Sequence, residues 1–183
     1  MKIEAVAFVW DGGAMIPLDR YRGLASRQFR PGAEYALIPH RARSEKAHGL
    51  YFKSVELAWK NLPDEHRLRA DGTDRYPTSE HLRKASLIKE GYADEHSILC
   101  ANEAQAQSVA ILARALDGYA IIKVSGSIVT IWTAKSQSHM AMGHEAFTES
   151  MNKVLERVAD MLGISSQQLT EEAKSAMTRQ GTS

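Results

Sequence analysis

The chain contains little of what several protein classes require. It has one cysteine, Cys100, among 183 residues, which excludes an internal disulfide framework and a cysteine-rich zinc module. No apolar run approaches the roughly 20 residues that cross a bilayer as a helix. The apolar run before Asp11 is only six residues long, 5–10, which is not the pattern of a secretory signal. We therefore expect a cytoplasmic protein without a membrane partner.

Recognised catalytic motifs are missing as well. The sequence contains no GxxxxGK[ST], GxGxxG or GxSxG, the motifs that bind nucleotide phosphates or carry a serine nucleophile. Among its seven histidines, His40 with His48 and His139 with His144 are the closer pairs. Neither pair has the i, i+3 or i, i+4 spacing that places two metal ligands on one helix face. We expect no catalytic residue, no metal and no cofactor.

Composition favours one ordinary globular domain. With 44% hydrophobic and 25% charged residues, the chain is close to the globular average. A chain of this length buries roughly 70% of its unfolded surface. We expect a single domain over 1–164, with 1–62 as an N-terminal subdomain that has a basic surface. Apolar residues are sparse after Ile164, so 165–183 should form a loosely docked helix or a frayed tail.

Hydrophobic periodicity predicts an α+β fold. Helical spacing occurs over 19–29, 44–62, 78–92, 102–116 and 147–162. The apolar run 5–10 predicts a buried strand. Further strands are predicted at the β-prone runs 35–38, 96–101, 119–124 and 127–133, and Ser125-Gly126 predicts a hairpin between the last two. The strands do not alternate regularly with the helices. We therefore expect a small, mostly antiparallel sheet packed by four to five helices, including a long C-terminal amphipathic helix.

Two polar features should lie at the surface. Residues 63–77 are charged and contain Asp71-Gly72, a turn signal, so a loop is predicted there. In the helix that follows, the apolar spacing places Arg83 and Lys84 on the outer face.

The net charge of +1 conceals an uneven distribution. Residues 1–60 hold ten Lys and Arg against six Asp and Glu. Within 20–46, arginines are interleaved with Tyr21, Phe29 and Tyr35. Cations mixed with aromatic residues are typical of surfaces that bind single-stranded nucleic acid, where bases stack on rings and phosphates pair with the cations. The alternative is a solvated face whose aromatic residues point inward.

The candidate binding residues on this basis are cations of two neighbouring segments. The first segment contributes Arg20, Arg22, Arg27, Arg30, Arg41 and Arg43. The helix after it contributes Lys46, Lys53 and Lys60. These lysines are seven residues apart, which places them in one stripe along the helix. Glu56 lies beside that stripe and neutralises part of it.

Two segments carry a resemblance to known proteins. Residues 41–52 read RARSEKAHGLYF and lead into a helix that contains Trp59. Residues 134–140 read AKSQSHM, follow the predicted hairpin and precede a Glu-Ala-Phe helix start. Both segments resemble an uncharacterised family of bacteriophage proteins, and they are also similar to the NinB (Orf) recombination proteins of lambdoid phages. The chain departs from NinB proteins at Ala47-His48, where Gln-Asn is expected, and 63–77 has no clear counterpart.

The resemblance implies a homodimer in the host cytoplasm that binds single-stranded DNA. Such a protein helps a recombinase work beside the single-strand binding protein and has no catalytic role of its own. The matched residues are Arg41, Arg43, Lys46 and Trp59 in the first segment and Lys135, Ser136 and Ser138 in the second. The last three follow a strand and could donate to phosphates; the alternative for them is an ordinary helix start.

Two other functions stay open. The arginines could pair with acidic residues of a host protein, such as a defence component or a replication factor, which the chain would inhibit or recruit. A metal-dependent nuclease would need His66, Asp71 and Asp74 to form one cluster.

Overall fold

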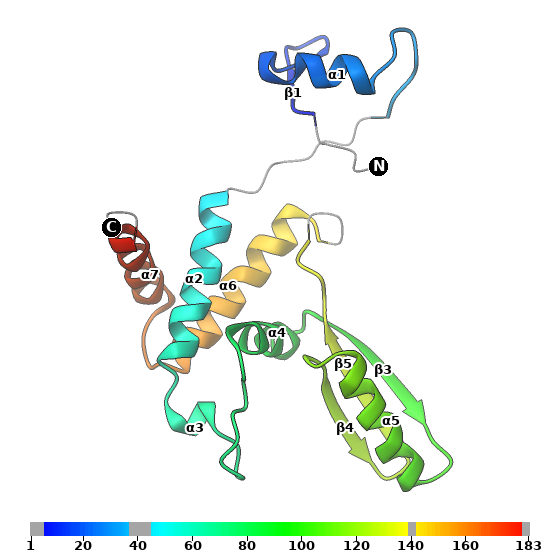
Figure 1. Ribbon diagram of the computed structural model, residues 1–183, viewed down its shortest axis with the longest axis vertical. Coiled ribbons are helices and arrows are strands. Elements are labelled where there is room, and N and C mark those ends of the chain that lie inside the picture. The colour runs from blue at the N-terminus through cyan, green and yellow to red at the C-terminus, as the bar shows by residue number, and fades with distance from the viewer. Residues whose placement is uncertain (1–5, 37–44, 139–141, 181–183) are drawn as a thin grey trace. The chain divides into compact units, whose positions relative to one another are not determined.

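The computed structural model describes residues 6–36, 45–138 and 142–180. The chain divides into two compact units, residues 1–40 and 41–183. Helices predominate and the described strands form two small antiparallel sheets, which confirms the predicted α+β class (Figure 1). The boundary lies at residue 40 and not at 62, because the helix that begins at Glu45 packs its apolar face in the second unit.

The first unit is a β-hairpin followed by a short helix. β1 (Phe8–Trp10) pairs with β2 (Met15–Pro17). In the turn between them, the Asp11 carboxylate accepts hydrogen bonds from the amides of Gly13 and Ala14 at 2.8 and 2.7 Å. A 3-10 turn, η1 (Asp19–Tyr21), leads into α1 (Arg22–Gln28).

Both strands predicted for this unit need correction. The run 5–10 was expected to be buried. Phe8 meets the Phe29 ring, but Val9 and Trp10 are 49% and 61% exposed, because so small a unit covers its two-stranded hairpin only in part. Of the predicted strand 35–38, Tyr35 and Ala36 have no strand structure, and the other two residues lie outside the described part of the chain.

Four helices build the main core of the second unit. α2 (Glu45–Lys60), α4 (Ser79–Lys89), α6 (His144–Asp160) and α7 (Ser166–Gln180) pack against one another (Figure 1). Their shared core includes Tyr51, Val55, Leu82, Leu87, Val154, Val158 and Leu169, each at most 1% exposed. The periodicity that predicted three of these helices therefore reflects their buried faces.

α7 occupies the segment that was expected to dock loosely or to fray. Leu169 and Ala173 have no exposed surface. They are four residues apart and therefore share one helix face. A pattern with few apolar residues thus provides a packed helix, because two of them, Leu169 and Ala173, face the core.

A three-stranded sheet and one helix form the rest of the second unit. β3 (Ala93–Leu99), β5 (Ile128–Ala134) and β4 (Ile121–Ser125) are antiparallel, in the order β3-β5-β4. α5 (Glu103–Leu116) packs on β4 and β5 over a small core of Cys100, Ala106, Ala110 and Val129.

Two sequence signals around this sheet are confirmed. Asn102 caps α5, since its side chain accepts a hydrogen bond from the Gln105 amide at 2.9 Å. The predicted hairpin joins β4 to β5: Ser125 pairs with Ile128, and Gly126 adopts a positive φ of 60°.

Residues 63–77 contain more structure than a plain loop. They include α3 (Asp64–Arg67) and an isolated bridge between Leu68 and Asp74. Gly72 takes a φ of 77° at the tip, and the Asp71 carboxylate accepts from the amide and hydroxyl of Thr73 at 3.0 and 2.6 Å. Within the ranges that the structure describes, no helix is both long and apolar enough to cross a membrane.

Candidate nucleic-acid interface

The first unit exposes the four arginines described there: Arg20, Arg22, Arg27 and Arg30. The Arg20 guanidinium lies 5.1 Å from the ring centroid of Tyr21. Arg22 pairs with Asp19 at 2.9 Å, but both side chains are mostly in solvent, where such pairs are weak. Arg27 and Arg30 form no ion pair with any residue that the structure describes. These two charges are therefore available to an external anion.

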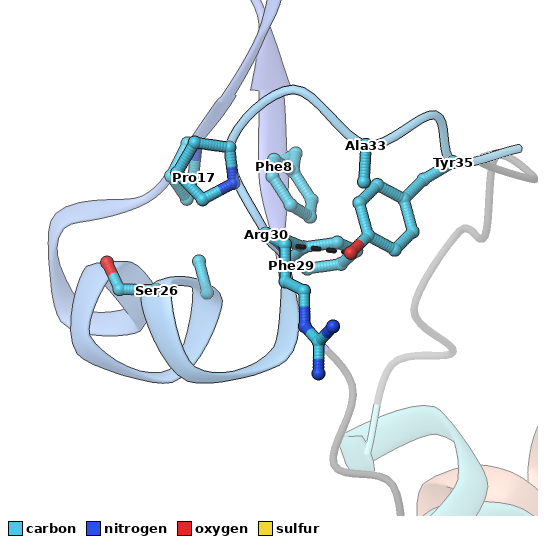
Figure 2. Close-up of a pocket in the computed structure, with 9 residues that line it drawn as sticks. Phe8, Pro17, Ser26, Phe29, Arg30, Ala33 and Tyr35 are labelled. Carbon is cyan, nitrogen blue, oxygen red and sulfur yellow. Dashed lines mark hydrogen bonds between the residues drawn. The ribbon is translucent and has the colours of Figure 1, made fainter.

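The same unit holds an apolar pocket of about 520 Å³ (Figure 2). We call it the aromatic pocket; it is lined by Phe8, Pro17, Ala25, Ser26, Phe29, Arg30, Pro31, Ala33 and Tyr35. The Phe29 ring meets Phe8 and Tyr35 edge-on, with centroids 5.6 and 5.0 Å away. The Arg30 amide donates to the Tyr35 hydroxyl at 2.9 Å, and the Arg30 guanidinium points away from the rings (Figure 2).

Two aromatic residues of the first unit are open to solvent. Trp10 is 61% exposed at the end of β1, and Tyr35 is 45% exposed at the aromatic pocket. Exposed rings of this kind offer stacking platforms to unpaired bases. Trp10 was expected in a buried strand. Trp10 comes directly before the Asp-Gly-Gly turn, and this position at the end of the strand could have predicted its exposure.

The predicted lysine stripe of α2 is partly neutralised. Lys53 and Lys60 both pair with Glu56, at 3.2 and 2.5 Å. The hydrogen bonds from Lys60 and Lys53 hold the pKa of Glu56 below its ordinary value. The Lys46 side chain lies outside the described part of the chain, as do Arg41 and Arg43.

Trp59 and the second predicted segment lie in local contacts of their own. The half-buried Trp59 indole donates to the Tyr76 carbonyl at 2.8 Å and so ties segment 63–77 to α2. Lys135, Ser136 and Ser138 are exposed after β5, and the Ser136 hydroxyl accepts from the Ser138 amide at 3.2 Å.

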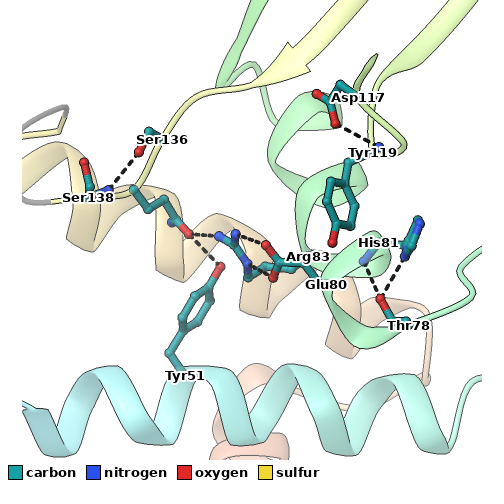
Figure 3. Close-up of polar contacts among 10 residues, drawn as sticks. Tyr51, Thr78, Glu80, His81, Arg83, Asp117, Tyr119, Ser136 and Ser138 are labelled. Atoms are coloured by element: carbon teal, nitrogen blue, oxygen red, sulfur yellow. Dashed lines mark hydrogen bonds and ion pairs between the residues drawn. The ribbon is translucent and has the colours of Figure 1, made fainter. Parts of the chain in front are cut away.

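Gln137, between these exposed residues, enters a largely buried polar network (Figure 3). Its side-chain oxygen accepts from Tyr51 at 3.4 Å and also from Arg83, and its side-chain nitrogen donates to the Ser150 hydroxyl at 2.7 Å. Arg83 in turn donates to both carboxylate oxygens of Glu80, at 2.7 and 2.6 Å.

Arg83 was expected on the outer face of its helix, but it is only 8% exposed. The network explains this difference, because a buried charge is tolerated where it is paired and hydrogen-bonded. The guanidinium also lies 5.4 Å from the Phe52 ring centroid. Hydrogen bonding to Arg83 lowers the pKa of Glu80, and burial raises the pKa of Tyr51. The network fixes the packing of this region and does not present its charge to a ligand.

The residues of the nuclease alternative are separate from one another. His66 lies in α3, the Asp71 carboxylate is bonded to Thr73, and Asp74 is 3.7 Å from Arg67. Within the described ranges, no three His, Cys, Asp or Glu side chains are grouped closely enough to hold a metal ion.

A second concentration of positive charge was missed by sequence analysis. A hollow in the second unit is lined by Arg69, Arg75, His81, Lys89, Arg114 and Arg157, together with Tyr76, Tyr119 and small or apolar residues. We call it the basic hollow. His81, Ala85 and Lys89 are four residues apart on α4 and therefore share one helix face. This spacing could have predicted one wall of the hollow from the sequence. The other cations come from distant segments that only the fold brings together.

Comparison with known proteins adds no relative to this description. No family model matches the chain, and neither does any curated protein or solved structure.

Proposed function

We propose that the chain binds single-stranded DNA through its first unit and acts as a non-catalytic accessory protein of phage-type DNA recombination. The observation that carries the binding proposal is the combination of two arginines without a described acidic partner, Arg27 and Arg30, with the exposed rings of Trp10 and Tyr35. The recombination role, a homodimeric state and work beside a single-strand binding protein in the host cytoplasm rest on the resemblance of 41–52 and 134–140 to NinB proteins.

The chemistry of this surface favours single strands over duplexes. Stacking on an aromatic ring requires a base whose face is free, and duplex DNA keeps its base faces covered by neighbouring base pairs. Stacking contributes about 1–3 kcal/mol per base and tolerates any sequence. The arginines add phosphate contacts that weaken with salt, at a log–log slope of about −0.7 per phosphate neutralised on a single strand.

The test is a titration of labelled oligo(dT) at several salt concentrations. Replacing Arg27 and Arg30 together by alanine should make the salt slope shallower by about 1.4, the contribution of two phosphate contacts. The double variant K153A/K174A is the matched control, because it removes two exposed lysines from α6 and α7 of the second unit. An R27A/R30A slope equal to that of the wild type would remove these arginines from the site. We also expect R41A/R43A to flatten the slope, as the sequence predicts.

The aromatic pocket favours one alternative, the capture of a host protein. Its apolar wall would accept an apolar side chain of such a partner, and the surrounding arginines would pair with acidic residues. Oligo(dT) and duplex DNA that both fail to bind at low salt, while the purified partner is retained, would favour this alternative over DNA binding.

A further inference from the structure

We propose that the basic hollow is a second binding site, separate from the first unit, for neighbouring phosphates of a nucleic-acid strand. The identification of the anion as nucleic acid rests on the function proposed above. The site itself rests only on residues of the second unit.

Four segments of the chain converge on this hollow. Segment 63–77 contributes Arg69 and Arg75, α4 contributes Lys89, the end of α5 contributes Arg114, and α6 contributes Arg157. The hollow has a volume of about 630 Å³, and no Asp or Glu lines it. This volume is within the usual range of ligand sites. Five cations thus share one concave surface that has no carboxylate in its wall.

Most of these charges are not neutralised by the protein. Lys89 and Arg114 form neither an ion pair nor a side-chain hydrogen bond with any described residue. Arg69 and Arg75 donate hydrogen bonds to neutral oxygens, the Thr73 hydroxyl at 3.4 Å and the Leu68 carbonyl at 3.3 Å. The Asp71 carboxylate lies near Arg69, since hydrogen bonds from Thr73, and with them the charge of Arg69, lower its pKa. Among the described residues, Arg157 is the one cation of the five that forms a salt bridge, with Glu90 at 3.3 Å.

The concentration of like charges in the hollow raises the electrostatic energy of the protein when no anion is bound. Cations that face one hollow repel one another, and a bound anion converts that repulsion into attraction. Four of the five cations are arginines, whose planar guanidinium groups match the oxygens of a phosphate in a two-point contact. Several separated cations suit a ligand with several phosphates better than one with a single charge.

Two of the residues that line the hollow, His81 and Tyr119, form an aromatic cluster, and Figure 3 shows their side chains next to each other. The Tyr119 ring is 4.6 Å from the His81 ring, centroid to centroid, and Lys84 places its ammonium 4.1 Å from the Tyr119 centroid. A hydrogen bond of 2.8 Å between the Thr78 hydroxyl and Nδ1 of His81 fixes the imidazole. The Asp117 carboxylate accepts from the Tyr119 amide at 2.9 Å and fixes the turn that carries the ring. Ordered rings beside cations are the combination used to hold single strands.

The experiment compares two double variants of the full chain that each remove two positive charges. K89A/R114A removes the two cations of the hollow that have no described partner, and K153A/K174A removes two exposed lysines outside it. In oligo(dT) titrations, K89A/R114A should lower the salt slope by about 1.4, whereas the control should keep the wild-type slope. Equal slopes in both variants, whether changed or unchanged, would overturn the proposal. Circular dichroism verifies that both variants are folded.

A second probe separates failure of this site from failure of the proposed function. If the wild-type chain does not bind oligo(dT), the proposed function is refuted, and the hollow is then tested with tripolyphosphate in thermal unfolding. A rise in Tm for the wild type and the control that is absent in K89A/R114A would support a phosphate site. The same rise in all three proteins, or no rise in any, would overturn it. Binding of polyglutamate by the wild type and K153A/K174A but not by K89A/R114A, without any binding of oligo(dT), would assign the hollow to acidic peptides instead.

Discussion

Tyr51 and Gln137 are 86 positions apart in sequence, and the Tyr51 hydroxyl donates a hydrogen bond to the Gln137 side-chain oxygen at 3.4 Å. Tyr51 belongs to segment 41–52 and Gln137 to segment 134–140, the two segments on which the proposed relation to NinB proteins rests. Their contact joins the two segments within the second unit. Tyr51 and Gln137 thus pack the second unit and do not face a ligand.

Replacing Gln137 by alanine should destabilise the second unit by about 1–3 kcal/mol, because it leaves largely buried polar groups of Tyr51, Arg83 and Ser150 without this partner. Urea unfolding followed by circular dichroism measures the effect. Q107A is the control: Gln107 is exposed on α5, where a substitution changes stability by no more than about 0.5 kcal/mol. Equal midpoints for Q137A and Q107A would show that the network contributes no stability.

Protonation of the Glu80 carboxylate should make the protein less stable in acid. Its pKa in the folded state lies below the ordinary value of 4.5, because Arg83 donates hydrogen bonds to the carboxylate. The stabilisation is therefore complete above the ordinary pKa and is lost as the pH falls through the lower folded value. The variant E80Q should lose less stability than the wild type between neutral and acidic pH. E172Q, changed at an exposed position of α7, should follow the wild type; an E80Q curve parallel to the wild type would contradict the assignment.

Trp10 should report DNA binding through its fluorescence. The other two tryptophans are half-buried, and their indoles donate at 2.8 Å to the Tyr76 carbonyl and to Glu95. Oligo(dT) should quench the wild type, and W10A should lose this quenching together with about 1–3 kcal/mol of binding free energy. W132F should retain both. Quenching that persists in W10A would place the stacking elsewhere.

Leu169 should be essential for the docking of α7. It is fully buried against the four-helix core, and truncating a buried leucine to alanine costs about 2–5 kcal/mol. L169A should therefore unfold at a clearly lower urea concentration. M177A, at a position of α7 that is 42% exposed, should remain close to the wild type. A loosely attached helix would make the two variants equivalent.

Much of the fold was predictable where local signals and burial agree. The cap at Asn102 and the turn at Gly126 depend on neighbouring residues, and the structure contains both. Arg83 was not predictable in the same way, because its burial depends on Gln137, which is 54 positions away and reaches it only in the folded chain. Hydropathy alone therefore placed a charged side chain on the wrong side of its helix.

The candidate sites were predictable only in part. Arg27 and Arg30 are exposed as their composition suggested, whereas Lys53 and Lys60 are paired with a carboxylate of their own helix. The basic hollow combines cations from segments that have no common sequence pattern. The count of charges in a stretch of sequence gives their sign and density, but the folded chain decides which of them remain unneutralised.

The core between α5 and the sheet has a consequence for how the molecule comes apart. It consists of Cys100, Ala106, Ala110 and Val129, with a few partly buried neighbours, so its small side chains remove little apolar surface from water. Opening this part therefore requires less free energy than opening the four-helix core. We therefore expect the amide hydrogens of α5 to exchange with solvent deuterium ahead of those of α2 and α6.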